Sequence, residues 1–267
     1  MTTRQAVPAF LLFLVSPVLM TARESREVKK TVPMKNDGRV FVDTYKGGIT
    51  VTTWDQPQVE IVARIEPGDS FFDRDDDAVQ ETEIRISGEG DEVRIRTDYS
   101  RIRSHHSSFF GLGDDDGIEP SVYYSIRMPK SARLSVKDYK SKTSLSGLQS
   151  DVAIDTYKGD VEVSDLAGSL DLKTYKGDSR ISFSRLARDS RFETSKGSIE
   201  ISVPKKTGFV VDYRLGRKAG LHSDFDLASI SSGRHRRDEI HDAETVNGGG
   251  PRIVLSSEKG VFSLREE

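Results

Sequence analysis

The stretch DTYKGDVEVSDL, residues 155–166, recurs with small changes along this chain of 267 residues. The other copies are DTYKGGITVTTW from Asp43, KDYKSKTSLSGL from Lys137, KTYKGDSRISFS from Lys173, ETSKGSIEISVP from Glu193 and SSEKGVFSLREE from Ser256. From Lys140 to Lys196 the aligned lysines are separated by 18, 18 and 20 residues. A regular period of this length indicates stacked structural units rather than independent hairpins.

Each unit predicts one coil made of two strands and a corner. Val152 and Ile154 alternate with polar residues before the corner, and Val161 and Val163 alternate with polar residues after it. A period of two is typical of a strand with one buried face. The apolar positions have even residue numbers before the turn and odd residue numbers after it. Both strands can therefore face one core while the Tyr-Lys pair lies outside. At Gly159 we expect a positive φ, which glycine adopts at little cost.

The fold class that follows is all-β, a β-solenoid or β-helix with coils of about 18–20 residues, right-handed by the rule for parallel crossovers. We expect a single solenoid domain over residues 36–267, with regular coils in 133–204. Three segments are poor in apolar residues and rich in Asp, Ser, Gly and His, and we interpret them as long loop insertions: 66–80, 98–119 and 216–250.

The first 22 residues have the pattern of a secretory signal peptide. Arg4 is followed by an apolar run, AFLLFLVSPVLM, and then by the small residues of Thr21-Ala22. The run is shorter than the roughly 20 residues that span a bilayer, so a retained membrane anchor is the weaker alternative. We therefore expect an exported protein, periplasmic or at the cell surface, which touches a membrane only through an uncleaved signal segment.

The bulk composition excludes several classes. Forty basic and 43 acidic residues give a formal net charge of -3, and they are mixed along the chain, so no basic field exists to attract nucleic acid. Cysteine is absent, so the protein has neither disulfides nor a cysteine that could carry a lipid.

A signal pattern followed by repeats of the form T-Y-K-G-x-[IV]-x-[IV], drifting to T-S-K-G, resembles the bacterial DUF4097 family. The resemblance covers about residues 36–267 and differs from the pattern at Ser141, where a corner glycine is expected. It implies a β-solenoid, export and an adhesin-like role.

The corner residues are the main binding candidates. Tyrosine rings at coil spacing offer faces for sugar rings, and lysines offer cations for carboxylates or phosphates. The alternative is that the tyrosines only stack on one another and cover the corner while the lysines keep it soluble. The candidates are Tyr139, Lys140, Tyr157, Lys158, Tyr175 and Lys176, with Tyr45 and Lys46 as a further step of the same ladder.

Metal and cofactor chemistry has little support in the sequence. The acid clusters at 73–77 and 114–117 lack the EF-hand spacing, and solvated loops explain them better than calcium sites. His105-His106, His235 and His241 match no zinc motif. We expect no cofactor and no metal.

The function predicted is a non-enzymatic interaction module whose partner is a cell-envelope glycan or envelope protein. The alternative is a β-helix enzyme acting on acidic polysaccharide, which needs carboxylates clustered on one face. Its candidates are the outward acids Asp160, Glu162, Asp171 and Asp178, which form no evident pair in the sequence.

Overall fold

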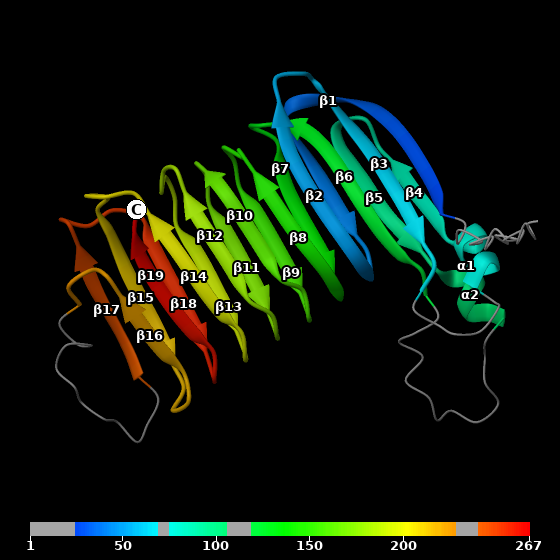
Figure 1. The fold of residues 1–267 in the computed structure, drawn as a ribbon. Coiled ribbons are helices and arrows are strands. Elements are labelled where there is room, and N and C mark those ends of the chain that lie inside the picture. The colour runs from blue at the N-terminus through cyan, green and yellow to red at the C-terminus, as the bar shows by residue number, and fades with distance from the viewer. Residues whose placement is uncertain (1–24, 69–74, 106–118, 228–239) are drawn as a thin grey trace, which may run out of the picture.

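The computed structural model describes residues 25–68, 75–105, 119–227 and 240–267. Each repeat forms one coil that contributes one strand to each of two sheets (Figure 1). The regular coils are β7 (Arg133–Asp138) with β8 (Lys140–Ser146), β9 (Val152–Thr156) with β10 (Val161–Leu166), β11 (Leu170–Thr174) with β12 (Ser179–Phe183), and β13 (Ser190–Thr194) with β14 (Ser198–Val203). Neighbouring coils pair in parallel, with Val152 opposite Leu170 and Val161 opposite Ser179. The predicted all-β solenoid is confirmed.

Irregular coils continue the stack on both sides. Towards one end lie β1 (Arg26–Asp43), β2 (Lys46–Trp54), β3 (Gln58–Glu66), β4 (Glu83–Ser87), β5 (Gly90–Asp98) and β6 (Ser121–Pro129). Towards the other lie β15 (Phe209–Leu215), β16 (Gly220–Ser223), β17 (Ile240–Val246), β18 (Arg252–Ser257) and β19 (Val261–Glu266).

The order of strands in space differs from their order in the chain. We call sheet A the order β1-β3-β6-β2-β8-β10-β12-β14-β19-β16. Sheet B has the order β4-β5-β1-β7-β9-β11-β13-β18-β15-β17. The coil of β1 and β2 is therefore inserted between coils that come later in the chain, and the coil of β18 and β19 is inserted between coils that come earlier (Figure 1). The C-terminal half of β1 and the strands β2, β18 and β19 are thus paired on both sides, whereas the N-terminal half of β1 pairs only with β3 at the edge of sheet A.

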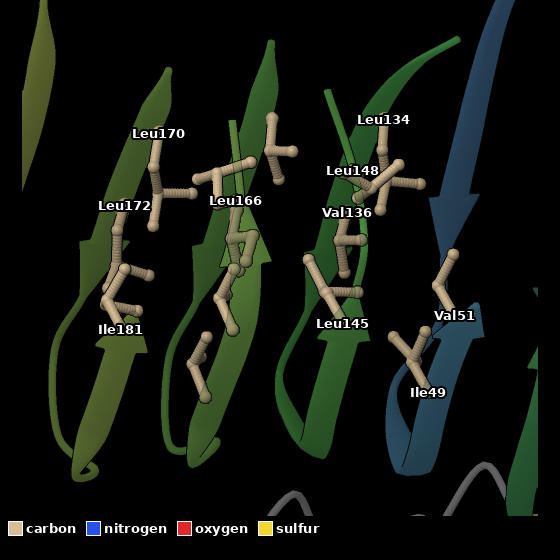
Figure 2. Close-up of a cluster of buried hydrophobic side chains, with 14 of the residues drawn as sticks. Ile49, Val51, Leu134, Val136, Leu145, Leu148, Leu166, Leu170, Leu172 and Ile181 are labelled. Carbon is tan, nitrogen blue, oxygen red and sulfur yellow. The ribbon is translucent and has the colours of Figure 1, made fainter. Parts of the chain in front are cut away.

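The core lies between the two sheets. Alternate residues of most strands point inward, as Ile154, Leu172 and Phe192 do in one row across β9, β11 and β13, each at most 2% exposed. Figure 2 shows such side chains from successive coils pointing into the same interior, among them Leu145 and Ile181. Burying one such side chain stabilises the fold by roughly 1.5–3 kcal/mol before entropy is counted.

Antiparallel strands lie at three of the four described ends of the two sheets, whereas sheet A ends at β16, which pairs in parallel with β19. β3 pairs antiparallel with both β1 and β6, β4 pairs antiparallel with β5, and β17 pairs antiparallel with β15. Two short helices, α1 (Asp75–Glu81) and α2 (Ser100–His105), lie beside each other at the end where β4 lies (Figure 1). These antiparallel pairings cap both ends of sheet B and the β1 end of sheet A.

The expected loop insertions contain more regular structure than their polarity indicates. α1 falls within 66–80 and reaches Glu81, α2 falls within 98–119, and β16 and β17 fall within 216–250. The sequence pattern missed these elements because each is short and has only a few buried residues, such as Val79 in α1 and Leu221 in β16.

The corner glycines form a column of close backbone contacts. A Cβ at Gly159 would clash with the carbonyl oxygen of Ser141, one at Gly177 with that of Gly159, and one at Gly197 with that of Gly177. Gly177 has φ +145, but Gly159 has no positive φ, so the expectation of a left-handed conformation at Gly159 was wrong. Glycine is required there because the next coil approaches too closely for a side chain.

We expect Gly159→Ala and Gly197→Ala each to lower the free energy of unfolding by about 1–3 kcal/mol, because an added methyl group meets backbone that cannot move aside. The matched control is Gly220→Ala, where a Cβ would lie 3.8 Å from the Val261 side chain and should change stability by less than about 0.5 kcal/mol. Chemical denaturation measures all three. Equal effects at the three positions would contradict the close-contact explanation.

Candidate functional site

The corner ladder is the edge of the solenoid where sheet B turns into sheet A. It consists of four tyrosines, Tyr45, Tyr139, Tyr157 and Tyr175, and six lysines, Lys46, Lys140, Lys158, Lys176, Lys196 and Lys259. Main-chain hydrogen bonds join successive corners: the Lys158 amide donates to the Tyr139 carbonyl at 2.8 Å, and the Lys176 amide donates to the Tyr157 carbonyl at 3.0 Å. The corners are therefore held at the spacing of neighbouring strands.

The tyrosine rings stack face to face along the ladder. Ring centroids are 4.9 Å apart from Tyr45 to Tyr139, 5.0 Å from Tyr139 to Tyr157 and 4.6 Å from Tyr157 to Tyr175, with interplanar angles of 4°, 13° and 3°. Tyr45 does continue the ladder, because the coil of β1 and β2 lies next to that of β7 and β8. Tyr139 and Tyr157 carry a ring on each face, so a sugar can reach only their edges and hydroxyl groups.

The lysine side chains lean over the tyrosines of the neighbouring coil. Lys158 Nζ lies 5.3 Å from the centroid of Tyr139, and Lys196 Nζ lies 4.9 Å from that of Tyr175. Lys196 also donates to the Tyr175 hydroxyl at 2.9 Å. This hydrogen bond raises the pKa of Lys196 and lowers the pKa of Tyr175. In the described part of the chain neither Lys140 nor Lys176 forms an ion pair.

Beside the tyrosines, on the outer face of sheet B, charges alternate from strand to strand. The pairings place Arg96 next to Asp43, then continue through Lys137, Asp155, Lys173 and Glu193 in that order. A cleft of about 440 Å³ runs between this row and the tyrosine rings. Since opposite charges neutralise each other along the row, the excess positive charge belongs to the column of lysines.

One corner departs from the repeat. Asp138 occupies the place of the inward threonine, and its Oδ1 accepts hydrogen bonds from the Ser141 amide at 2.8 Å and the Thr156 hydroxyl at 2.9 Å. In the regular corners Thr156 and Thr194 instead accept from the amides of Gly159 and Gly197. Oδ2 of Asp138 is buried without a hydrogen-bond partner. Burial raises the pKa of Asp138 to about 6, partly offset by its two hydrogen bonds.

Sequence reasoning did not single out Asp138, although the signal was there. The copy KDYKS replaces threonine by aspartate and glycine by serine, and both replacements fall in the same corner. The two changes belong together. The carboxylate of Asp138 accepts a hydrogen bond from the amide of Ser141, and in the next coil the hydroxyl of Thr156 accepts the equivalent hydrogen bond from the amide of Gly159.

The carboxylates proposed for an enzyme do not converge. Glu162 lies on the outer side of sheet A, Asp160 and Asp178 lie in the corner turns directly before β10 and β12, and Asp171 lies on sheet B. Asp160 Oδ1 accepts the Asp178 amide, and Asp178 Oδ1 accepts the Ser198 amide, at 3.0 and 3.1 Å. These two acids cap neighbouring strands rather than face one another as an acid and base pair.

Most of the candidate metal ligands lie outside the described residues. These are Asp73, His106, the whole cluster at 114–117, and His235. Asp77 is exposed on α1, and His241 Nε2 lies 3.2 Å from Asp212. Within the described ranges, no three His, Asp or Glu side chains are grouped as metal ligands would be.

The segment 1–22, predicted to be a signal peptide, also lies outside the described residues. Neither α1 nor α2, the two helices that the structure describes, is long and apolar enough to cross a bilayer.

Comparison with known proteins identifies the repeats. Residues 130–225 match the model of a family described as Toastrack DUF4097, which confirms the resemblance inferred from the T-Y-K-G pattern. No curated protein matches the sequence.

Three solved structures resemble the chain at low identity. One is a "putative cell adhesion protein" from Clostridium sporogenes, with TM-score 0.48 and 8% identity over 91% of this chain and 100% of that one. Another is a "putative adhesin" from Bacteroides fragilis, with TM-score 0.34 and 12% identity over 91% and 97%. A "putative lipid binding protein" from Parabacteroides distasonis has TM-score 0.26 and 9% identity over 89% and 96%.

We expect Asp138→Thr to stabilise the protein at neutral pH, because it removes a buried carboxylate and keeps a hydroxyl for the Ser141 amide. The folded-state pKa of about 6 lies above the ordinary 3.8. The contribution of Asp138 to stability is therefore fully present below pH 3.8 and is lost as the pH rises through 6. Two pKa units correspond to a loss on the order of 3 kcal/mol.

The measurement is urea unfolding of the wild type and of Asp138→Thr at about pH 4 and about pH 8. The increase in the free energy of unfolding caused by the substitution should be larger at the higher pH. The contributions of the other carboxylates cancel in this difference, because both proteins contain them. A gain that is the same at both pH values would show that Asp138 has an ordinary pKa in the folded state.

Proposed function

We propose that this chain, whose residues 130–225 match the model of the Toastrack DUF4097 family, is an exported, non-enzymatic interaction module that binds an anionic polymer of the cell envelope along the corner ladder. The observation that carries the proposal is the column of lysines held at coil spacing by the stacked tyrosines. The adhesin-like role implied by the repeats fits a surface of this kind.

Repetition gives the corner ladder its binding capacity. Neighbouring strands are about 4.8 Å apart, so the ladder presents a cation at every coil along one straight edge. One exposed contact between a lysine and an anion contributes roughly 0.2–1 kcal/mol, which is too little alone. An extended polymer meets several such contacts at once, and each contact after the first is effectively intramolecular.

The tyrosine stack contributes rigidity and polar groups rather than open ring faces. Its rings are fixed by their neighbours, and Lys158 and Lys196 rest against them. Side chains that are already ordered lose less entropy on binding. The mode of recognition we propose is therefore contact of anionic groups with the lysines and of hydroxyl groups with the tyrosine edges, in place of sugar stacking on the rings.

Two further points support the proposal. The pattern of residues 1–22 is that of an exported protein. The outward acids Asp160 and Asp178 are engaged with backbone amides, and Asp171 is on the other sheet, so they offer no pair of carboxylates for hydrolysis or elimination.

The test replaces Lys140, Lys158 and Lys176 together by Gln and measures retention on immobilised polygalacturonate, with neutral dextran as the blank matrix. We expect the variant to bind about tenfold more weakly or worse, because three ionic contacts are lost. The salt dependence of retention should also decrease, since fewer ions are displaced.

A matched control carries the same change of charge away from the corner ladder: Lys29, Lys35 and Lys205 replaced together by Gln. Lys29 and Lys35 are exposed on β1 and paired with Glu27 and Asp91. If the control triple loses as much retention as the corner triple, binding depends on net charge alone and the ladder is only a structural cap.

A further inference from the structure

A second surface lies on the outer face of sheet B, at the strand ends far from the corner ladder. A groove of about 740 Å³ runs there across successive coils. Arg39 in the groove and Tyr45 in the ladder are six positions apart in the sequence, which is roughly 20 Å of extended chain. The groove exists because Ser135 and Ala153 are small and lie between longer side chains on either side.

Two arginines stand side by side at one end of this groove. Arg39 on β1 is directly opposite Arg133 on β7, and both are exposed. Like charges opposite each other on neighbouring strands destabilise a sheet. The same two strands place Asp43 opposite Lys137, four residues further on, so these strands do pair opposite charges elsewhere and the arginine pair is an exception.

Two carboxylates on neighbouring strands or loops, Glu92 and Asp151, are engaged elsewhere. Glu92, opposite Arg39 on β5, forms its ion pair with Arg94. Asp151, beside Arg133, is held by Arg188 at 3.1 Å and accepts the Ser169 hydroxyl at 2.6 Å. Among the residues that the structure describes, no carboxylate lies within ion-pair distance of Arg39 or Arg133.

The remaining lining is suited to a sugar chain. Phe41 and Ala153 offer apolar surface, and Arg94 lies over the Phe41 ring at 4.4 Å. Asp171 and Asp189 line the part of the groove further along the stack and can accept hydrogen bonds from hydroxyl groups. Arginine binds a carboxylate through two parallel N–H groups, a geometry that lysine lacks.

We propose that this groove binds a short acidic oligosaccharide, with one carboxylate held between Arg39 and Arg133 and sugar hydroxyls directed to Asp171. The site is independent of the corner ladder, because a ligand of a few sugars fits the groove without reaching any lysine of the ladder. A net charge of -3 attracts no anion at long range, so recognition depends on the local arginine pair.

The test is isothermal titration of the purified protein with trigalacturonate, a carboxylated trisaccharide, at low salt. Three proteins are compared: the wild type, Arg39→Gln/Arg133→Gln, and the corner variant Lys140→Gln/Lys158→Gln/Lys176→Gln. The methyl ester of the same trisaccharide removes the charge and keeps the sugar, and a triglutamate peptide keeps the charge and removes the sugar.

We expect the wild type and the corner variant to bind trigalacturonate equally, and the arginine double variant to bind at least tenfold more weakly, as expected for lost charge-assisted hydrogen bonds. The arginine variant should unfold at a midpoint no lower than the wild type, because it removes a repulsion. The methyl ester should bind weakly to all three proteins.

Three results would overturn the proposal. Equal affinity of the wild type and the arginine variant would remove the arginine pair from the site. Loss of binding in the corner variant alone would move the site to the lysines, in agreement with the proposed function but against the groove. Triglutamate binding as tightly as trigalacturonate would show that the groove accepts any carboxylate chain and has no preference for sugars.

Discussion

The close approach of successive corners is the constraint on which the other features depend. Gly159, Gly177 and Gly197 each lie against a carbonyl of the preceding corner, with no room for a Cβ. This contact, with the amide to carbonyl bonds beside it, holds the coils at the distance of paired strands. The tyrosine spacing of 4.6–5.0 Å and the register of the lysines follow from it. A corner that could accept a side chain would spread the coils and separate the rings.

The same register produces two surfaces of different chemistry on sheet B. Near the corner it alternates Asp43, Lys137 and Asp155, so that charges cancel from strand to strand. At the opposite end of the same strands it places Arg39 opposite Arg133. The first arrangement stabilises the sheet and the second costs stability, which is why the second is the better indication of a binding site. Neither surface requires a change in the backbone.

The insertion of the terminal coils links distant parts of the chain. β1 pairs with β5 and β7, and β18 pairs with β13 and β15. Tyr45 reaches the stack, and Arg39 reaches Arg133, only because of this insertion. Contacts between segments about 90 residues apart must form before the first coil is complete, which is expected to make folding slower than for coils added in sequence order.

The sequence by itself determined the strands of the repeated coils, their corners, the inward rows and the tyrosine-lysine ladder, because all of these repeat within about 18 residues and the period of two marks the buried face. It did not determine which coils are neighbours, since pairing between strands depends on main-chain hydrogen bonds that leave no trace in local spacing. The tertiary structure alone decided that Arg39 meets Arg133, that Glu92 and Asp151 turn to other partners, and that Asp138 is buried with a raised pKa. It also gave the reason for glycine at 159, which is a contact between coils rather than a backbone angle of its own.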